Sequence, residues 1–145
     1  MNARIHHLAV WVVAVVQWII GGVWYAIFGN LWLNLHAKTM TDIEDPHSVL
    51  PYAIAFIAAL FVSYGLAWAI NRQNAQGAGC GLAIGVICWF CFLFVEHATI
   101  SVFSSFGTNP WPLILLDMGR PLLAFAVGGI ILGVWQKEGS KTTAA

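Results

Sequence analysis

The sequence places four ionisable residues inside long apolar stretches: Glu96, His97, Asp117 and Arg120. A charge at the centre of a membrane helix costs about 2.5–3.5 kcal/mol on insertion scales, so such residues usually face one another inside a bundle. Asp117 and Arg120 are one helical turn apart and can therefore pair. Two interpretations follow. The charges neutralise one another, with Glu96 as a third member, or they line a pocket for a small ligand or ion.

Two further features bear on this region. Pro121 has no N–H group, so the carbonyl of Asp117 loses its helical partner, and a kinked turn beside an ion pair is a common way to build a polar site in a membrane helix. Trp24 and Tyr25 end the first predicted span nearby, and Gln17 lies deeper on the same helix, from where it could reach the cluster. We therefore expect an intramembrane polar or ligand-binding cluster that consists of Glu96, Asp117, Arg120, Trp24, Tyr25 and Gln17.

Glu96 and His97 are neighbours, about 100° apart around a helix, and they cannot both face one point. In a regular α-helix, Trp89, Leu93 and Glu96 share one stripe. This spacing predicts that Glu96 points into the bundle. His97 is then expected to face the rim.

Cys88 and Cys91 form a C-x-x-C pattern that would suit a quinone-linked dithiol site. Thiolate chemistry needs surroundings that favour the anion, and an apolar position inside a membrane span disfavours it. We favour ordinary packing for these cysteines and keep redox chemistry as an alternative. The histidines match no tight metal or haem spacing. The sequence also lacks a P-loop, an H-E-x-x-H motif and a nucleophile elbow, so we predict no catalytic residue, metal or cofactor.

The composition points to a membrane protein. Of the 145 residues, 60% are hydrophobic and only 8% are charged, against about 25% charged residues in soluble domains. Six basic and six acidic side chains cannot cover the surface of a soluble domain of this length. The formal net charge is zero, which leaves no basic patch for a nucleic acid. We therefore expect the lipid bilayer, and no nucleic acid, as a partner.

Four charge-poor windows of membrane-spanning length must position the polar residues: about 8–28, 51–70, 80–102 and 111–135. Each is close to the roughly 20 residues that cross about 30 Å of hydrocarbon as an α-helix. None alternates between polar and apolar residues, as the strands of a membrane barrel would. The sequence predicts an all-α protein, a single membrane domain folded as a four-helix transmembrane bundle.

The basic residues give the expected orientation. Four of them fall on one side of the predicted spans: Arg4, Arg72, Lys137 and Lys141. Lys38 alone falls on the other side. Because basic loops stay in the cytoplasm, we expect both termini there, with residues 29–50 as an outer loop and 136–145 as a cytoplasmic tail. The predicted location is the inner (plasma) membrane, which the chain would cross several times.

Glycines recur every fourth residue in two of the spans. They are Gly77, Gly81 and Gly85 in one, and Gly129 and Gly133 in the other. Small residues at this spacing let membrane helices approach closely. They predict tight helix contacts and offer a surface for a homodimer.

Several short segments carry a family resemblance: Gly22-Val23-Trp24-Tyr25, Phe28-Gly29 with Trp32, Leu113-Ile114 with Gly119, and Gly128-Gly129-Ile130-Ile131-Leu132-Gly133-Val134-Trp135. Through them the chain resembles the small bacterial membrane proteins catalogued as domain of unknown function 1761. The resemblance covers roughly residues 8 to 137, and the first and last helices carry it. It implies a four-helix membrane protein of about this size and no particular activity or site.

The function that the residues favour is binding of a small hydrophobic or amphipathic ligand in the outer half of the bundle. One alternative is a small proton-coupled transporter, in which Glu96 or Asp117 takes the proton. Four helices are few for alternating access, so this alternative requires a dimer. A second alternative is a membrane thiol or quinone redox protein that uses Cys88 and Cys91.

Overall fold

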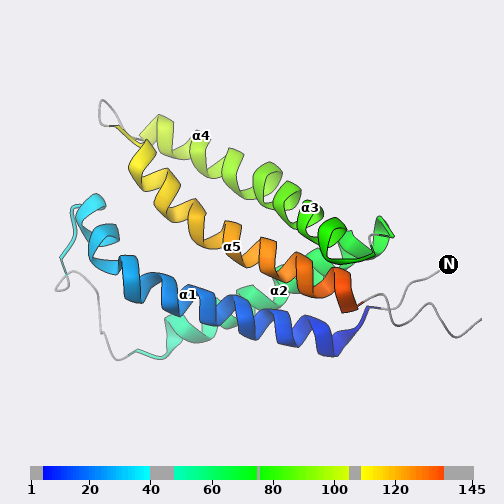
Figure 1. Cartoon of the computed structure of the whole chain (residues 1–145). Helices are drawn as coiled ribbons and strands as arrows, with labels where there is room; N and C mark the ends of the chain where they lie inside the picture. The colour runs from blue at the N-terminus through cyan, green and yellow to red at the C-terminus, as the bar shows by residue number, and fades with distance from the viewer. Residues whose placement is uncertain (1–4, 40–47, 75, 105–108, 136–145) are drawn as a thin grey trace, which may run out of the picture.

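The computed structural model describes residues 5–39, 48–74, 76–104 and 109–135, and all regular structure in these residues is helical (Figure 1). The elements follow in the order α1 (His7–Leu35), α2 (Leu50–Arg72), α3 (Ala78–Cys88), η2 (Trp89–Phe94), α4 (Val95–Ser104) and α5 (Trp111–Trp135). The segment η2 is a six-residue π-helical stretch. Together α3, η2 and α4 form one continuous helix, Ala78–Ser104.

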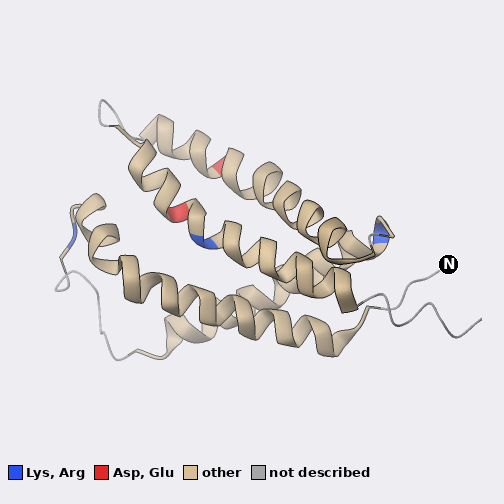
Figure 2. Cartoon of the chain, viewed as in Figure 1, with Lys and Arg blue, Asp and Glu red and all other residues tan. Residues whose placement is uncertain are grey.

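Four helices are therefore long and apolar enough to cross a membrane, with mean hydropathies between 1.7 and 2.4 over their most apolar windows. Charged residues are rare along them (Figure 2). The predicted all-α fold with four membrane-spanning helices is confirmed. A multi-pass integral membrane protein is the class that this architecture defines.

The first helix is longer than the sequence suggested. It continues past Phe28 as far as Leu35, so the predicted outer loop 29–50 begins with helical residues. The chain leaves the helix only near Ala37, whose φ of 51° breaks the helical geometry. The tail 136–145 lies outside the described residues.

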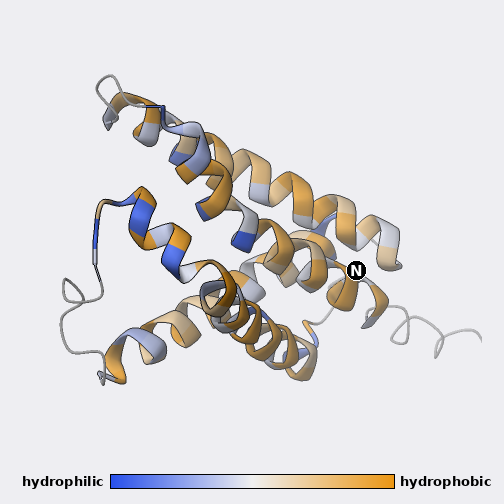
Figure 3. Ribbon diagram, turned by 60° about the vertical axis from the view of Figure 1, so that its left-hand side comes forward, coloured by the Kyte–Doolittle hydropathy of each residue, from blue (hydrophilic) through white to orange (hydrophobic). Residues whose placement is uncertain are grey.

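The helix α5 lies between the others and is the most deeply packed of the four. It contacts α1 on one side and α3 on the other (Figure 1). Buried side chains from α1, α2 and α5 form the core, with Val13, Ile70 and Phe125 among them. Hydrophobic residues dominate the helices (Figure 3), and many of them are exposed, with Phe61 and Phe92 about three-quarters exposed (75% and 73%). Apolar surface on this scale suits hydrocarbon and not water.

Two ends of the bundle can be distinguished. At the first, which we call the His7 end, α1 begins and α5 ends, and the rings of His6 and Trp135 lie 6.4 Å apart. At the opposite end, the Leu35 end, α1 and α4 finish and α5 begins.

The repeated glycines bring α3 and α5 into backbone contact. A Cβ atom added at Gly81 would collide with the carbonyl oxygen of Gly129, and one added at Gly85 would collide with that of Phe125. At the start of α3, the N–H of Gly77 donates a 2.8 Å hydrogen bond to the carbonyl of Gly133. These glycine faces are thus used within the chain. The predicted homodimer would need a different surface, and the oligomeric state stays a prediction.

Candidate functional site

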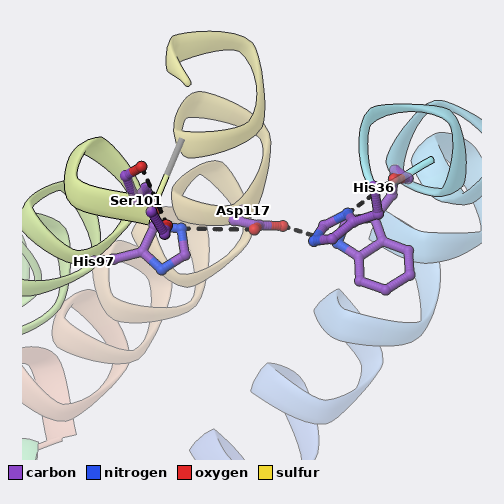
Figure 4. A network of polar contacts seen from close by, with 6 residues as sticks. His36, His97, Ser101 and Asp117 are labelled. Atoms are coloured by element: carbon purple, nitrogen blue, oxygen red, sulfur yellow. Dashed lines mark hydrogen bonds and ion pairs between the residues drawn. The ribbon is translucent and has the colours of Figure 1, made fainter. Parts of the chain in front are cut away.

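One polar network joins α1, α4 and α5 at the Leu35 end of the bundle (Figure 4). The indole Nε1 of Trp32 donates a 2.9 Å hydrogen bond to Oδ1 of Asp117. The other carboxylate oxygen of Asp117 lies 3.6 Å from Nε2 of His97. His36 extends the network because its Nδ1 lies 2.9 Å from the carbonyl oxygen of Trp32 and its ring lies 4.1 Å from the Trp32 ring. One carboxylate therefore links three helices.

The prediction that Glu96 points inward is wrong, since Glu96 is exposed and His97 faces Asp117. The π-helical segment η2 gives the physical reason. A π turn contains one more residue than the corresponding α-helical turn, which rotates the following residues by about 100°. The inward position expected for residue 96 is therefore occupied by residue 97. The inward stripe runs from Trp89 through Leu93 to His97, all partly buried.

Among the described residues, Asp117 and Arg120 are not within ion-pair distance of each other. The Arg120 side chain extends toward α1, where its guanidinium Nη1 would lie 3.7 Å from a Cβ placed on Gly21. The Nε atom of Arg120 is buried and has no hydrogen-bond partner. Residues three apart can pair, but here Asp117 contacts Trp32 and His97 while Arg120 extends toward Gly21. The predicted cluster is thus divided in two, with Asp117 on one side and Arg120 on the other.

Arg120 lines a cavity of about 810 Å³. The cavity lies between residues 17–26 of α1, 51–62 of α2 and 120–125 of α5. Three residues of the predicted cluster line it: Gln17, Tyr25 and Arg120. Asp117, Glu96 and Trp24 do not. The structure therefore does not bring all six predicted residues together at one site.

The wall of the cavity is mostly apolar, with a few polar groups. The buried side chain of Gln17 donates a 3.4 Å hydrogen bond from Nε2 to the carbonyl of Ala124, in the turn after Pro121. At the rim, Trp18 Nε1 donates to the carbonyl of Tyr52 at 3.3 Å and ties α1 to α2. Trp18 and Tyr52 are 41% and 60% exposed, so the cavity opens on the apolar outer surface of the bundle.

Trp24 packs α1 against α5. Its indole covers Gly119, where an added Cβ would lie 2.7 Å from the ring atom Cη2. The centroid of the Phe28 ring lies 4.6 Å from that of Trp24. Trp24 therefore packs helices together at the level of Asp117 and Arg120 without reaching the cavity.

Sequence reasoning missed Trp32 and His36 because both fell in the predicted outer loop. A usable signal was present, since no proline or glycine follows Gly29 before the helix ends, and the two residues are four apart on one helix face. Trp89, which the sequence predicted on the inward stripe, donates a 3.1 Å hydrogen bond from Nε1 to the carbonyl of Met118, beside the proline-disrupted turn of α5.

The described residues contain no group of three histidine, cysteine or acidic side chains close enough to hold a metal ion. The three cysteines are free thiols. Cys88 is partly buried, and Cys91 lies on the exposed side of η2. The fold and this site thus describe a four-helix membrane protein with an intramembrane polar network and a separate cavity that contains an arginine.

The family model described as Protein of unknown function (DUF1761) matches residues 8–133, and the chain belongs to this family. This confirms the resemblance drawn from the glycine and tryptophan segments of the first and last helices. Comparisons with curated proteins and with solved structures found no match.

Proposed function

We propose that this membrane protein binds a small hydrophobic or amphipathic molecule in the cavity between α1, α2 and α5. The observation that carries the proposal is the combination of an apolar cavity with an arginine that lacks a partner among the described residues. Ligand pockets commonly measure about 300–1,000 Å³ and combine apolar walls with a few placed polar groups. The cavity of about 810 Å³, with Arg120 and Gln17 in its wall, falls in this class.

The depth of the cavity supports entry from the bilayer. Arg120 is nine residues from the start of α5, which corresponds to about 13 Å of helix. The hydrocarbon core is about 30 Å thick, so this level lies inside it. Exposed wall residues such as Ile19 and Tyr52 would face acyl chains, and a lipid-soluble ligand could enter without crossing water.

We also propose that the protein lies in the plasma membrane, with the His7 end of the bundle in the cytoplasm. Arg72, the last residue of α2, lies at that end, in keeping with the preference of basic loops for the cytoplasm. An alkaline phosphatase fused to the carboxyl terminus is expected to be inactive, and a fused green fluorescent protein is expected to fluoresce. An active phosphatase fusion would show that the carboxyl terminus lies outside the cytoplasm and would contradict the proposed orientation.

Native mass spectrometry of the detergent-solubilised protein tests binding. We expect hexadecanoic acid or hexadecanol to form a one-to-one complex. Gly22 lines the cavity, and no atom lies within 4 Å of a Cβ added there, so Gly22→Leu should place an alkyl side chain in the cavity and reduce the complex at least tenfold. Gly29→Leu is the matched control, because Gly29 has equally open surroundings on the same helix and does not line the cavity.

Two results would contradict the proposal. One is the absence of any complex with either compound in the unmodified protein. The other is equal complex formation by the unmodified protein, Gly22→Leu and Gly29→Leu, which would place the compounds on the outer surface of the helices.

A further inference from the structure

We infer that the cavity takes a single-chain anionic amphiphile, whose carboxylate pairs with Arg120 and whose alkyl chain lies between α1 and α2. This inference rests on the proposed function and names the class of ligand. Three observations carry it: the missing counter-charge of Arg120, the different engagement of Asp117, and the length of the cavity.

The guanidinium of Arg120 lacks a counter-charge among the described residues. An arginine side chain remains protonated in proteins, so this group carries its charge within the membrane span. Its Nε is buried without a hydrogen-bond partner. Such a charge is costly in hydrocarbon unless an anion approaches it. A ligand that brings a negative group to Arg120 would therefore gain free energy that a neutral ligand would not.

The nearest acidic residue in sequence cannot supply this charge in the conformation described. Asp117 accepts the Trp32 hydrogen bond with one oxygen and lies against His97 with the other. Glu96 is exposed on α4 and does not line the cavity. The acidic groups of the spans are thus directed elsewhere, and the cavity keeps a net positive wall.

The planar guanidinium suits a carboxylate. It presents parallel N–H donors that bind both oxygens of a carboxylate at once, which adds geometric specificity to the charge attraction. Tyr25 also lines the cavity, one helical turn from Gly21. The head of the ligand would sit against Arg120.

The rest of the cavity suits one alkyl chain. Its wall spans residues 17–26 of α1 and 51–62 of α2, or about 14 and 17 Å of helix. Arg120 lies beside Gly21, within this length, so a chain that starts at the guanidinium would follow one part of the wall and continue through the open rim into the lipid. Ala55, Ala58 and Ala59 form the α2 wall, and their small side chains leave room for a chain to lie along the helix.

The test compares two ligands that differ only in the head group, hexadecanoate and hexadecanol. Their affinities are measured by native mass spectrometry on the full chain in detergent. We expect the unmodified protein to prefer hexadecanoate at least tenfold. Arg120→Gln is expected to abolish this preference, and Arg120→Lys, which keeps the charge but loses the planar fork, is expected to retain part of it.

The possible results bear on different parts of the inference. Equal binding of the two compounds by the unmodified protein would overturn the anionic head group and leave the proposed function intact, and this comparison requires no variant to fold. A preference that persists in Arg120→Gln would overturn the role of Arg120. Preferred binding of the two-chain lipid phosphatidylglycerol over hexadecanoate would overturn the single-chain assignment. Failure of both compounds to bind would overturn the proposed function itself.

Discussion

Trp32 and Asp117, eighty-five residues apart in the sequence, are joined by a 2.9 Å hydrogen bond from the indole Nε1 to Oδ1 of the carboxylate. The bond fixes the last turns of α1 against the first turns of α5. A typical hydrogen bond contributes about 0.5–1.5 kcal/mol to stability, and one with a charged partner about 1.5–3 kcal/mol. Because Asp117 is bound in this way, it is not available to Arg120, and the cavity keeps its positive charge.

The first prediction concerns this bond. Asp117→Ala removes the acceptor and leaves the partly buried indole N–H unpaired, so we expect a loss of about 1–3 kcal/mol of stability. The double variant with Trp32→Phe should lose less than the sum of the two single variants, since they remove the same interaction. Thermal unfolding of the detergent-solubilised proteins measures both effects. Additive losses would mean that the two side chains are not coupled.

The second prediction concerns the contact of Trp24 with α5. An alanine at Gly119 would place its Cβ 2.7 Å from the Trp24 ring, so we expect Gly119→Ala to displace the indole and cost about 1–3 kcal/mol through overpacking. Gly22→Ala is the control, because Gly22 has no neighbouring atom within 4 Å of an added Cβ. The melting temperature should fall for the first variant and remain or rise for the second. Equal melting temperatures would contradict the described packing of Trp24.

The third prediction concerns the glycine contact between α3 and α5. Gly81→Ala would push a methyl group into the carbonyl of Gly129, and a backbone atom cannot rotate away. We expect a loss at the upper end of the range of about 1–3 kcal/mol for overpacking, or failure to fold. Gly79→Ala, two residues earlier with open surroundings, should retain the stability of the unmodified protein. Tolerance of Gly81→Ala would mean that the two helices are further apart.

The fourth prediction concerns the register set by the π-helical segment. Because Glu96 is exposed and His97 faces Asp117, Glu96→Gln should leave the melting temperature unchanged or raise it by removing a charge from an apolar surface. His97→Phe should lower it, since Asp117 loses a polar neighbour. A lower melting temperature for Glu96→Gln than for His97→Phe would support the inward orientation of Glu96 that a regular helix predicts.

The membrane architecture could be predicted because it depends on composition and on the length of apolar stretches. These features are summed over many residues, so one unusual residue does not change them. The details of the site depend on single residues. The orientation of Glu96 and His97 could not be predicted, because residues 89–94 carry no sequence mark that separates a π-helical from an α-helical turn. Trp32 was missed because a helix that leaves the hydrocarbon region loses the apolar signal that reveals it.

The cavity could be anticipated only in part. Gln17, Tyr25 and Arg120 line it, and the places of these residues in the predicted spans already put them within reach of one another, with Gln17 the deeper residue of the first span. The separation of Arg120 from Asp117 was not visible, because it depends on the direction in which each side chain leaves α5. A spacing of three residues permits pairing without requiring it.

Photo-crosslinking tests most directly whether an amphiphile binds in the cavity between α1 and α2, beside Arg120. A hexadecanoate analogue with a diazirine in its alkyl chain would be irradiated with the purified protein, and the modified residues would be mapped by mass spectrometry. We predict adducts within residues 17–26 and 51–62, and their loss when unlabelled hexadecanoate is added in excess. Adducts spread over the exposed faces of all four helices, without competition, would contradict the account.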